Sequence, residues 1–269
     1  WNGGYREYFA VKANPNPRIV QILREEGCGV DCSSLTELML AQALGFSGEE
    51  IMFSSNMTPA NEFEYARSLN AIINLDDITH IDFLRRHGGI PERICLRYNP
   101  GGTLQFGTFV MGNPGEAKYG FTKEQLLIGV HKLMELGVKS FGLHAFLASN
   151  TTDNAYYPVL ARMLFELAVE LHEKTGAPFF MINLSGGIGV PYRPDQSEAD
   201  IMAIGEGVRL AHEQVLAHTP LKDVSIVTEL GRYVTAPAGW LVARAIHEKH
   251  IYRDYIGLDA CAADLMRPA

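Results

Sequence analysis

Short apolar runs alternate with longer stretches of helical periodicity along most of the chain. Eight runs have the length and the β-branched or aromatic content of buried strands: residues 8–13, 29–33, 51–55, 71–76, 94–99, 140–147, 179–184 and 224–229. Helical stretches follow, with apolar positions three and four residues apart, at 17–26, 35–43, 60–69, 80–87, 123–136, 156–175 and 199–217. Eight strands that alternate with helical stretches in about 230 residues predict an α/β fold, a (β/α)8 TIM-type barrel.

The predicted strands end in polar residues or in glycine. These strand ends carry Lys12, Asp31, Ser33, Ser54, Asp76, Arg97, Asn99, His144, Ser185 and Glu229. In a closed barrel the carboxyl ends of the strands meet at one rim, where barrel enzymes have their active sites. Solvated loops are polar as well. That alternative explains Asp76 well, but it is a weaker explanation for a lysine, a histidine and a glutamate between apolar runs.

The pattern changes after residue 232. Apolar, β-rich runs at 240–242 and 255–258 have no helical stretch between them. We expect residues 1–232 to form the barrel, and residues 233–269 to begin a β-type C-terminal domain that is truncated. So few residues cannot bury a hydrophobic core of their own.

Composition excludes several classes of function. The chain has 269 residues, a net charge of −8 and a pI of about 5.6, so it lacks the basic surface of nucleic-acid-binding proteins. No apolar stretch reaches the roughly 18 residues that span a membrane. The four cysteines have no metal-ligand spacing, and we expect them, Cys261 included, to be buried thiols. With no signal peptide visible, the sequence predicts a cytoplasmic protein without a metal site.

Lys12 is the first candidate for chemistry. It stands at the end of an apolar run, just before Asn14-Pro15 stops the strand. A lysine fixed at the end of a core strand is expected to have a lowered pKa and to form a Schiff base with an aldehyde. The structural alternative is a stem that packs against the apolar residues while the ammonium group reaches solvent beside Asn14.

Two further motifs follow predicted strands. Ser185-Gly186-Gly187-Ile188-Gly189 brings backbone N–H groups together as anion-binding turns do, although a tight barrel turn has the same composition. Glu229-Leu230-Gly231-Arg232 ends the eighth strand. Its two charged side chains can form a structural ion pair. Opposite a lysine, the glutamate could instead keep a pyridine nitrogen protonated, so that the ring acts as an electron sink.

These motifs occur in the order found in one family of enzymes. The segments are Phe9-Ala10-Val11-Lys12-Ala13-Asn14, Val30-Asp31-Cys32-Ser33-Ser34 with Glu37, Gly142-Leu143-His144, the glycine turn, the Glu229 motif and Asp264-Leu265-Met266-Arg267-Pro268-Ala269. Together they resemble the pyridoxal-phosphate-dependent decarboxylases of the alanine-racemase-like fold, most closely the diaminopimelate decarboxylases. The resemblance implies pyridoxal 5′-phosphate as cofactor and the decarboxylation of meso-diaminopimelate to L-lysine, in lysine biosynthesis.

The resemblance also implies roles for individual residues. Lys12 would hold the cofactor as a Schiff base, Glu229 would pair with the pyridine nitrogen, and Asp31 would bias the protonation of Lys12. The cofactor phosphate would be held by Gly186, Gly187, Gly189, Gly231 and Ser149. Arg232, beside the cofactor, and Arg267, from the second domain, would bind the far end of the amino-acid substrate.

The chain departs from the family pattern in three places. The family's Glu-Pro-Gly-Arg is Glu229-Leu230-Gly231-Arg232 here, which keeps both charged groups and changes only the turn. The family has His-x-His-Ile-Gly-Ser where this chain has His144-Ala145-Phe146-Leu147-Ala148-Ser149, so Phe146 would stack on the cofactor in place of the second histidine. His144 is then either part of the site or a core histidine. The family's later tyrosine and Cys-Glu motif, which completes the site across a homodimer interface, is absent. An ornithine or arginine decarboxylase and a non-catalytic pyridoxal-phosphate-binding barrel are the alternative functions.

Overall fold

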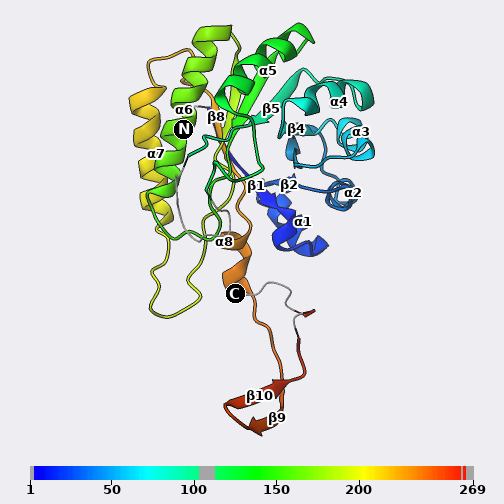
Figure 1. Ribbon diagram of the computed structural model, residues 1–269, viewed down its shortest axis with the longest axis vertical. Coiled ribbons are helices and arrows are strands. Elements are labelled where there is room, and N and C mark those ends of the chain that lie inside the picture. The colour runs from blue at the N-terminus through cyan, green and yellow to red at the C-terminus, as the bar shows by residue number, and fades with distance from the viewer. Residues whose placement is uncertain (1–2, 103–112, 262, 265–269) are drawn as a thin grey trace. The chain divides into compact units, whose positions relative to one another are not determined.

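The computed structural model describes residues 3–102, 113–261 and 263–264. The chain divides into two compact units between Thr235 and Ala236. The first unit contains strands β1 to β8 with helices α1 to α8, and the second contains strands β9 and β10 (Figure 1). The expected start of the second domain, at residue 233, lies close to this division. That these residues begin a β-type C-terminal domain stays a prediction.

The first unit is a closed parallel barrel. Each strand pairs with the next one in sequence, and β8 pairs with β1. The strands are β1 (Tyr5–Ala10), β2 (Gly29–Cys32), β3 (Ile51–Ser54), β4 (Ile72–Leu75), β5 (Arg93–Arg97), β6 (Ser140–His144), β7 (Phe179–Asn183) and β8 (Ser225–Thr228). The predicted (β/α)8 barrel is therefore confirmed.

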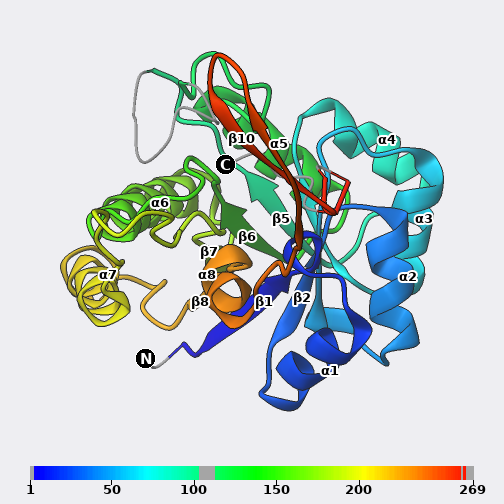
Figure 2. The same ribbon diagram turned by 90° about the horizontal axis from the view of Figure 1, so that it is seen from below.

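Helices surround the barrel (Figure 2). They are α1 (Pro17–Glu25), α2 (Leu35–Ala43), α3 (Ala60–Ser68), α4 (Thr79–His87), α5 (Lys123–Glu135), α6 (Tyr156–Thr175), α7 (Ile201–Val215) and α8 (Arg232–Thr235). The side chains of Asn16 and Asp200 accept hydrogen bonds from backbone N–H groups in the first turns of α1 and α7, which fixes where these helices begin. None of the described helices is both long and apolar enough to cross a membrane.

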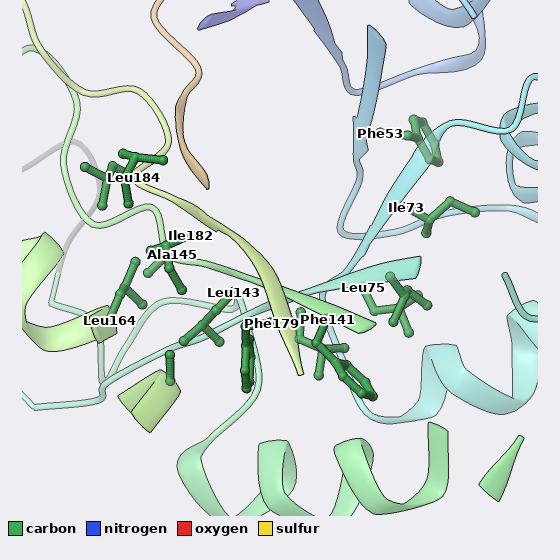
Figure 3. Close-up of a cluster of buried hydrophobic side chains, with 14 of the residues drawn as sticks. Phe53, Ile73, Leu75, Phe141, Leu143, Ala145, Leu164, Phe179, Ile182 and Leu184 are labelled. Atoms are coloured by element: carbon green, nitrogen blue, oxygen red, sulfur yellow. The ribbon is translucent and has the colours of Figure 1, made fainter. Parts of the chain in front are cut away.

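The larger part of the hydrophobic core lies between the strands and the helices. Figure 3 shows side chains of β6 and β7 beside Leu164 of α6. The rings of Phe141 and Phe179 have centroids 6.2 Å apart, and Leu143, Leu164 and Ile182 are fully buried. Close packing of this kind holds each helix against the strands, so the positions of the strand ends are fixed.

A second, smaller cluster fills the inside of the barrel. This interior plug consists of Tyr8, Met52, Ile72, Cys95, Met181 and Val227. A Cβ atom at Gly142 would lie 3.0 Å from the sulfur of Cys95, and one at Gly29 would lie 2.7 Å from the Tyr8 ring. Two strands therefore contribute glycine, because the larger side chains of the others occupy the space. The plug leaves the carboxyl ends of the strands as the place for a site.

The first strand lies three residues earlier in the chain than predicted. It ends at Ala10, and Val11–Ala13 form a 3₁₀ turn that is closed by a hydrogen bond of 3.1 Å from Asn14 N to Val11 O. The expectation of one strand over 8–13 is wrong, because apolar composition alone does not separate a strand from a buried turn. Lys12 consequently lies on the turn beyond the barrel wall.

The second unit contains an antiparallel hairpin of β9 (Ala245–His250) and β10 (Asp254–Leu258). The apolar run 240–242 forms no strand, and Cys261 is exposed. The expectation of a buried Cys261 thiol is thus wrong. A unit of this size has too few residues to enclose a side chain.

Glu7 joins β1 to β8 on the outer side of the barrel wall. Its Oε1 accepts a hydrogen bond of 2.5 Å from Leu230 N, and its Oε2 accepts one from the Thr228 hydroxyl. The Thr228 hydroxyl also lies 2.6 Å from the hydroxyl of Tyr5. Burial raises the pKa of Glu7 from 4.5 to about 8, although its hydrogen bonds act in the opposite direction.

We expect the substitution Glu7→Gln to stabilise the protein increasingly as the pH rises from about 4.5 to about 8. In this window the folded state holds a proton on Glu7 that the unfolded state has released, so wild-type stability falls with rising pH. The amide mimics the protonated acid and removes this loss, which reaches up to about 5 kcal/mol at the upper end of the window. Urea denaturation of both proteins across the window measures the difference.

The exposed Glu198 provides a matched control, because Glu198→Gln should leave the pH dependence as it is in the wild type. A stability difference between Glu7→Gln and wild type that stays constant with pH would contradict the assignment.

Candidate functional site

A layer of polar side chains lies inside the barrel, two residues beyond the interior plug along each strand. Successive residues of a strand face opposite sides, so these residues face inward as the plug residues do. The register agrees, because Ala10 pairs with Asp31, and His144 pairs with both Arg97 and Asn183. The polar layer consists of Asp31, Ser54, Asn74, Arg97, His144, Asn183 and Glu229, and Ala10 takes the equivalent position on β1.

Lys12 reaches this layer from the turn that follows β1. Its Nζ lies 3.7 Å from Oδ2 of Asp31, and its side chain is 60% exposed while that of Asp31 is 1% exposed. The charge of Asp31 raises the pKa of Lys12 above its usual value and outweighs the opposing effect of burial. The expected lowering of this pKa is therefore wrong. The Asp31 side chain therefore favours the protonated form of the Lys12 amine, and this amine remains accessible to solvent.

Glu229 is held by three side chains inside the barrel. Its Oε1 accepts a hydrogen bond of 2.7 Å from the Asn183 amide. Its Oε2 accepts one of 3.0 Å from the Ser185 hydroxyl and lies 3.3 Å from Nε2 of His144. The Glu229 residue is 6% exposed and His144 is 1% exposed. The strand-end histidine thus contacts Glu229, whereas Arg232 contacts Tyr192.

The two buried carboxyl groups differ in their pKa. Burial raises the pKa of Glu229, but the charge and hydrogen bond of His144, the charge of Lys12 and the Asn183 amide outweigh it and lower the pKa to about 2. Burial and the charge of Glu229 raise the pKa of Asp31 well above its usual range, against the effect of Lys12. Glu229 is therefore the carboxyl group of this pair that ionises more readily.

Several buried polar atoms of this layer have no partner. Among the described residues, Oδ1 of Asp31, Oδ1 of Asn74 and Nδ1 of His144 are buried without a hydrogen bond. Such an atom costs about 1–3 kcal/mol when nothing satisfies it. Three of them on the inner face of one barrel indicate a place where a polar ligand is bound.

The glycine turn stands directly after β7. Ser185 and Gly187 have positive φ angles of 57° and 115°. The N–H of Gly189 donates to Thr151 O at 2.8 Å, whereas no hydrogen bond within the described residues engages the N–H groups of Gly186 and Gly187. The two free N–H groups are the ones that this turn can offer to an anion.

Close approach of neighbouring chain segments requires the glycines of this turn. A Cβ atom at Gly186 would lie 2.6 Å from Glu229 O, and one at Gly189 would lie 2.1 Å from the side chain of Asn150. A Cβ atom at Gly231 would lie 2.6 Å from that of Ala13, next to Lys12. The glycine turn, the end of β8 and the Lys12 turn are therefore packed against one another.

Phe146 lies beside a guanidinium group. The Arg97 guanidinium is 5.7 Å from the centre of the Phe146 ring and 4.3 Å from that of Tyr119, and it forms a 3.1 Å ion pair with Asp76. Phe146 also lines a small pocket with Arg97 and Tyr119. Its predicted stacking on a cofactor ring stays a prediction.

Three further residues were predicted to bind the cofactor or the substrate. Two of them lie in segments that follow strands of the barrel, and the third is outside the residues that the structure describes. Arg232 begins α8 and stacks on Tyr192, 5.6 Å from the ring centre. Ser149 is half-buried in the loop after β6. Arg267 lies outside the described residues. The structure thus brings Lys12, Asp31 and Glu229 to one polar layer and gives no position for Arg267.

Two residues of the polar layer were missed at the level of sequence. Asn183 and Asn74 stand two positions after Met181 and Ile72, and both are buried. Their amides donate to Glu229 and, at 3.1 Å, to the Ser54 hydroxyl. Alternate residues of a strand face the same side of the sheet. Counting two positions forward from the last apolar residue that faces inward would have identified both asparagines.

Comparison with known proteins places the chain in a family. Residues 3–236 match the family described as pyridoxal-dependent decarboxylase, pyridoxal binding domain. The chain therefore belongs to the pyridoxal-dependent decarboxylases, and pyridoxal 5′-phosphate is the cofactor of this domain. The resemblance drawn from the motifs is confirmed.

The relatives include proteins that are named for a specific reaction. Protein TabA of Pseudomonas amygdali pv. tabaci is 33% identical over 267 residues, which are 99% of this chain and 62% of TabA. Diaminopimelate decarboxylase of Methanothermobacter thermautotrophicus is 29% identical, over 98% of this chain and 62% of that enzyme. The chain therefore spans less than two thirds of the length of these curated relatives.

A solved structure shows the same fold. Diaminopimelate decarboxylase from M. jannaschii, in complex with L-lysine, superposes with a TM-score of 0.89 at 24% identity. The match covers 98% of this chain and 62% of that one.

The residues of the polar layer fit pyridoxal phosphate. An accessible amine at Lys12 suits the aldehyde, and the carboxylate of Glu229 suits a protonated ring nitrogen. The free N–H groups of the glycine turn suit the phosphate, and the unpartnered polar atoms suit a polar ring.

We expect Gly186→Ala to weaken the binding of pyridoxal phosphate by roughly tenfold to a hundredfold. The new methyl group would meet the backbone oxygen of Glu229, which cannot move without displacing the carboxylate, and strain of this kind costs about 1–3 kcal/mol. Titration of the cofactor, followed by absorbance, measures the dissociation constant.

Gly205→Ala in α7 is the matched control, because no atom lies within 4 Å of the added Cβ. It should stabilise the helix by up to about 1 kcal/mol and leave cofactor binding intact. Equal cofactor affinities for Gly186→Ala and wild type would refute the assignment of the turn.

Proposed function

We propose that the protein is a pyridoxal-phosphate-dependent amino-acid decarboxylase that converts meso-diaminopimelate to L-lysine. One observation carries the proposal. An accessible lysine, a buried ionised glutamate and a glycine turn with two free N–H groups lie together at the carboxyl end of the barrel. The family match supports the cofactor, and the relatives named diaminopimelate decarboxylase support the substrate.

Lys12 is the proposed attachment point of the cofactor. Its amine is open to solvent on one side and paired with Asp31 on the other. Asp31 has a raised pKa, so it can take up or return a proton at Nζ of Lys12 as the amine changes between charged and neutral forms. Lys12 and Asp31 thus control the proton on the reacting nitrogen.

Glu229 is the proposed partner of the ring nitrogen. Pyridoxal phosphate, when bound, supplies an electron sink for the pair of electrons left by the departing carboxylate. A protonated ring nitrogen strengthens this sink, and an ionised carboxylate keeps the proton there. The hydrogen bonds of Asn183 and Ser185 hold Glu229 in that state and in one orientation.

The phosphate and substrate contacts follow the resemblance. Gly186, Gly187, Gly189, Gly231 and Ser149 are the proposed phosphate-binding residues. We propose that Arg232 and Arg267 bind the far end of the substrate, because a guanidinium group pairs with a distal carboxylate in bidentate geometry. The cytoplasmic location, the homodimer and the place in lysine biosynthesis are further proposals that rest on the resemblance.

A decarboxylase for a different amino acid is the second candidate. Protein TabA, at 33% identity, is more similar to this chain than the diaminopimelate decarboxylase at 29%. Phe146 also departs from the histidine expected at that position. Ornithine and arginine therefore belong in the substrate test, beside a barrel that binds the cofactor without catalysis.

We expect Lys12→Ala to abolish the visible absorbance band of bound pyridoxal phosphate and to reduce carbon dioxide release to background. The amine of Lys12 is the group that forms the covalent bond to the cofactor aldehyde. Spectra and carbon dioxide release are measured for meso-diaminopimelate, ornithine and arginine with the purified protein.

Lys139→Ala is the control, since Lys139 pairs with Glu92 on the surface at the amino end of β6. It should leave the spectrum and the turnover as they are in the wild type. A cofactor band that survives in Lys12→Ala would overturn the site. Turnover of ornithine or arginine in preference to diaminopimelate would replace the proposed substrate.

A further inference from the structure

We propose that His144 is a positioning residue that acts through Glu229. Its Nε2–H donates to the carboxylate from inside the barrel and thereby holds the carboxylate in the orientation that faces the cofactor ring. The inference rests on the proposed cofactor site and assigns a role that the motifs leave open.

The geometry joins three consecutive strands at one carboxylate. His144 ends β6, Asn183 ends β7, and Glu229 directly follows β8. His144 pairs in register with Asn183, and Asn183 with Val227, so the three side chains lie at neighbouring positions on the inner face. His144 reaches Oε2 of Glu229 at 3.3 Å while Asn183 binds Oε1 at 2.7 Å. Each oxygen thus has its own strand-end donor.

The other cationic side chains near Glu229 are paired with different carboxylates. The titratable groups that face the same interior are Lys12, Asp31, Cys95, Arg97 and Glu229. Lys12 is paired with Asp31 at 3.7 Å, and Arg97 is paired with Asp76 at 3.1 Å. Among the described residues, His144 is the titratable donor within 4.0 Å of the Glu229 carboxylate.

Within the described residues, the His144 ring has its polar contact with Glu229. Nδ1 of His144 is buried and has no partner within the described residues, so burial of the ring is not compensated on that side. The Nε2 contact with Glu229 is the polar interaction that the ring makes. Because a bare carboxylate buried in a protein is costly, loss of that donor would let Glu229 rotate or take up a proton.

The test compares two polar substitutions that differ in reach. The amide nitrogen of His144→Gln can occupy the position of Nε2, whereas the shorter amide of His144→Asn stops near the position of Nδ1. We expect His144→Asn to lower kcat about 10- to 100-fold with little change in KM, the effect of one lost hydrogen bond to a charged group. His144→Gln should restore most of the activity.

A spectroscopic measurement separates positioning from a general structural effect. The pH titration of the bound-cofactor absorbance should shift in His144→Asn and return toward the wild-type curve in His144→Gln. In a Glu229→Gln background, His144→Asn should cause no additional shift, because His144 acts through the carboxylate. His131→Asn on the exposed face of α5 is the surface control.

The outcomes distinguish this inference from the proposed function. A wild-type protein without a Lys12-dependent cofactor band would refute the cofactor site itself. A wild-type band with unchanged kcat and pH titration in His144→Asn would refute only the role of His144. Additive effects of His144→Asn and Glu229→Gln would also contradict it, because independent sites add and coupled ones do not.

Discussion

The site depends on the alternation of side chains along eight parallel strands, because this alternation decides which residues face the inside of the barrel. Each strand directs alternate side chains inward, and closure of the barrel leaves no free edge at which the register could shift. The interior plug uses the first inward positions, and it is so tightly filled that Gly29 and Gly142 have no room for a Cβ atom. The next inward positions stand at the carboxyl ends, where polar groups can converge on a ligand.

Burial of two carboxyl groups in one small volume determines the electrostatics. The charge of Glu229 adds to burial in raising the pKa of Asp31, whereas His144, Lys12 and Asn183 lower the pKa of Glu229. Asn183, Ser185 and His144 all contact the Glu229 carboxylate, and these contacts favour its ionised form. A charged carboxylate at a fixed position is what a protonated ring nitrogen requires, and this links the packing of β6, β7 and β8 to the chemistry of the family.

The proposed nucleophile, Lys12, is paired with Asp31. Lys12 is largely exposed, and Asp31 favours its charged form. In the proposed reaction with an aldehyde the amine of Lys12 is neutral, and Asp31, an acid with a raised pKa, is the proposed group that exchanges the proton. The Lys12 turn is packed against Gly231, which couples the amine to the end of β8.

The sequence by itself determined the barrel, the order of the family motifs and the positions of Lys12, Glu229 and the glycine turn. Hydrophobic periodicity and motif spacing are local properties, and they can be seen without knowing which strands are neighbours. Only the tertiary structure decided that Asn183 and His144 bind Glu229, that Lys12 is exposed and that the first strand ends at Ala10. These facts depend on register and on side-chain reach between strands far apart in sequence, which no local pattern encodes.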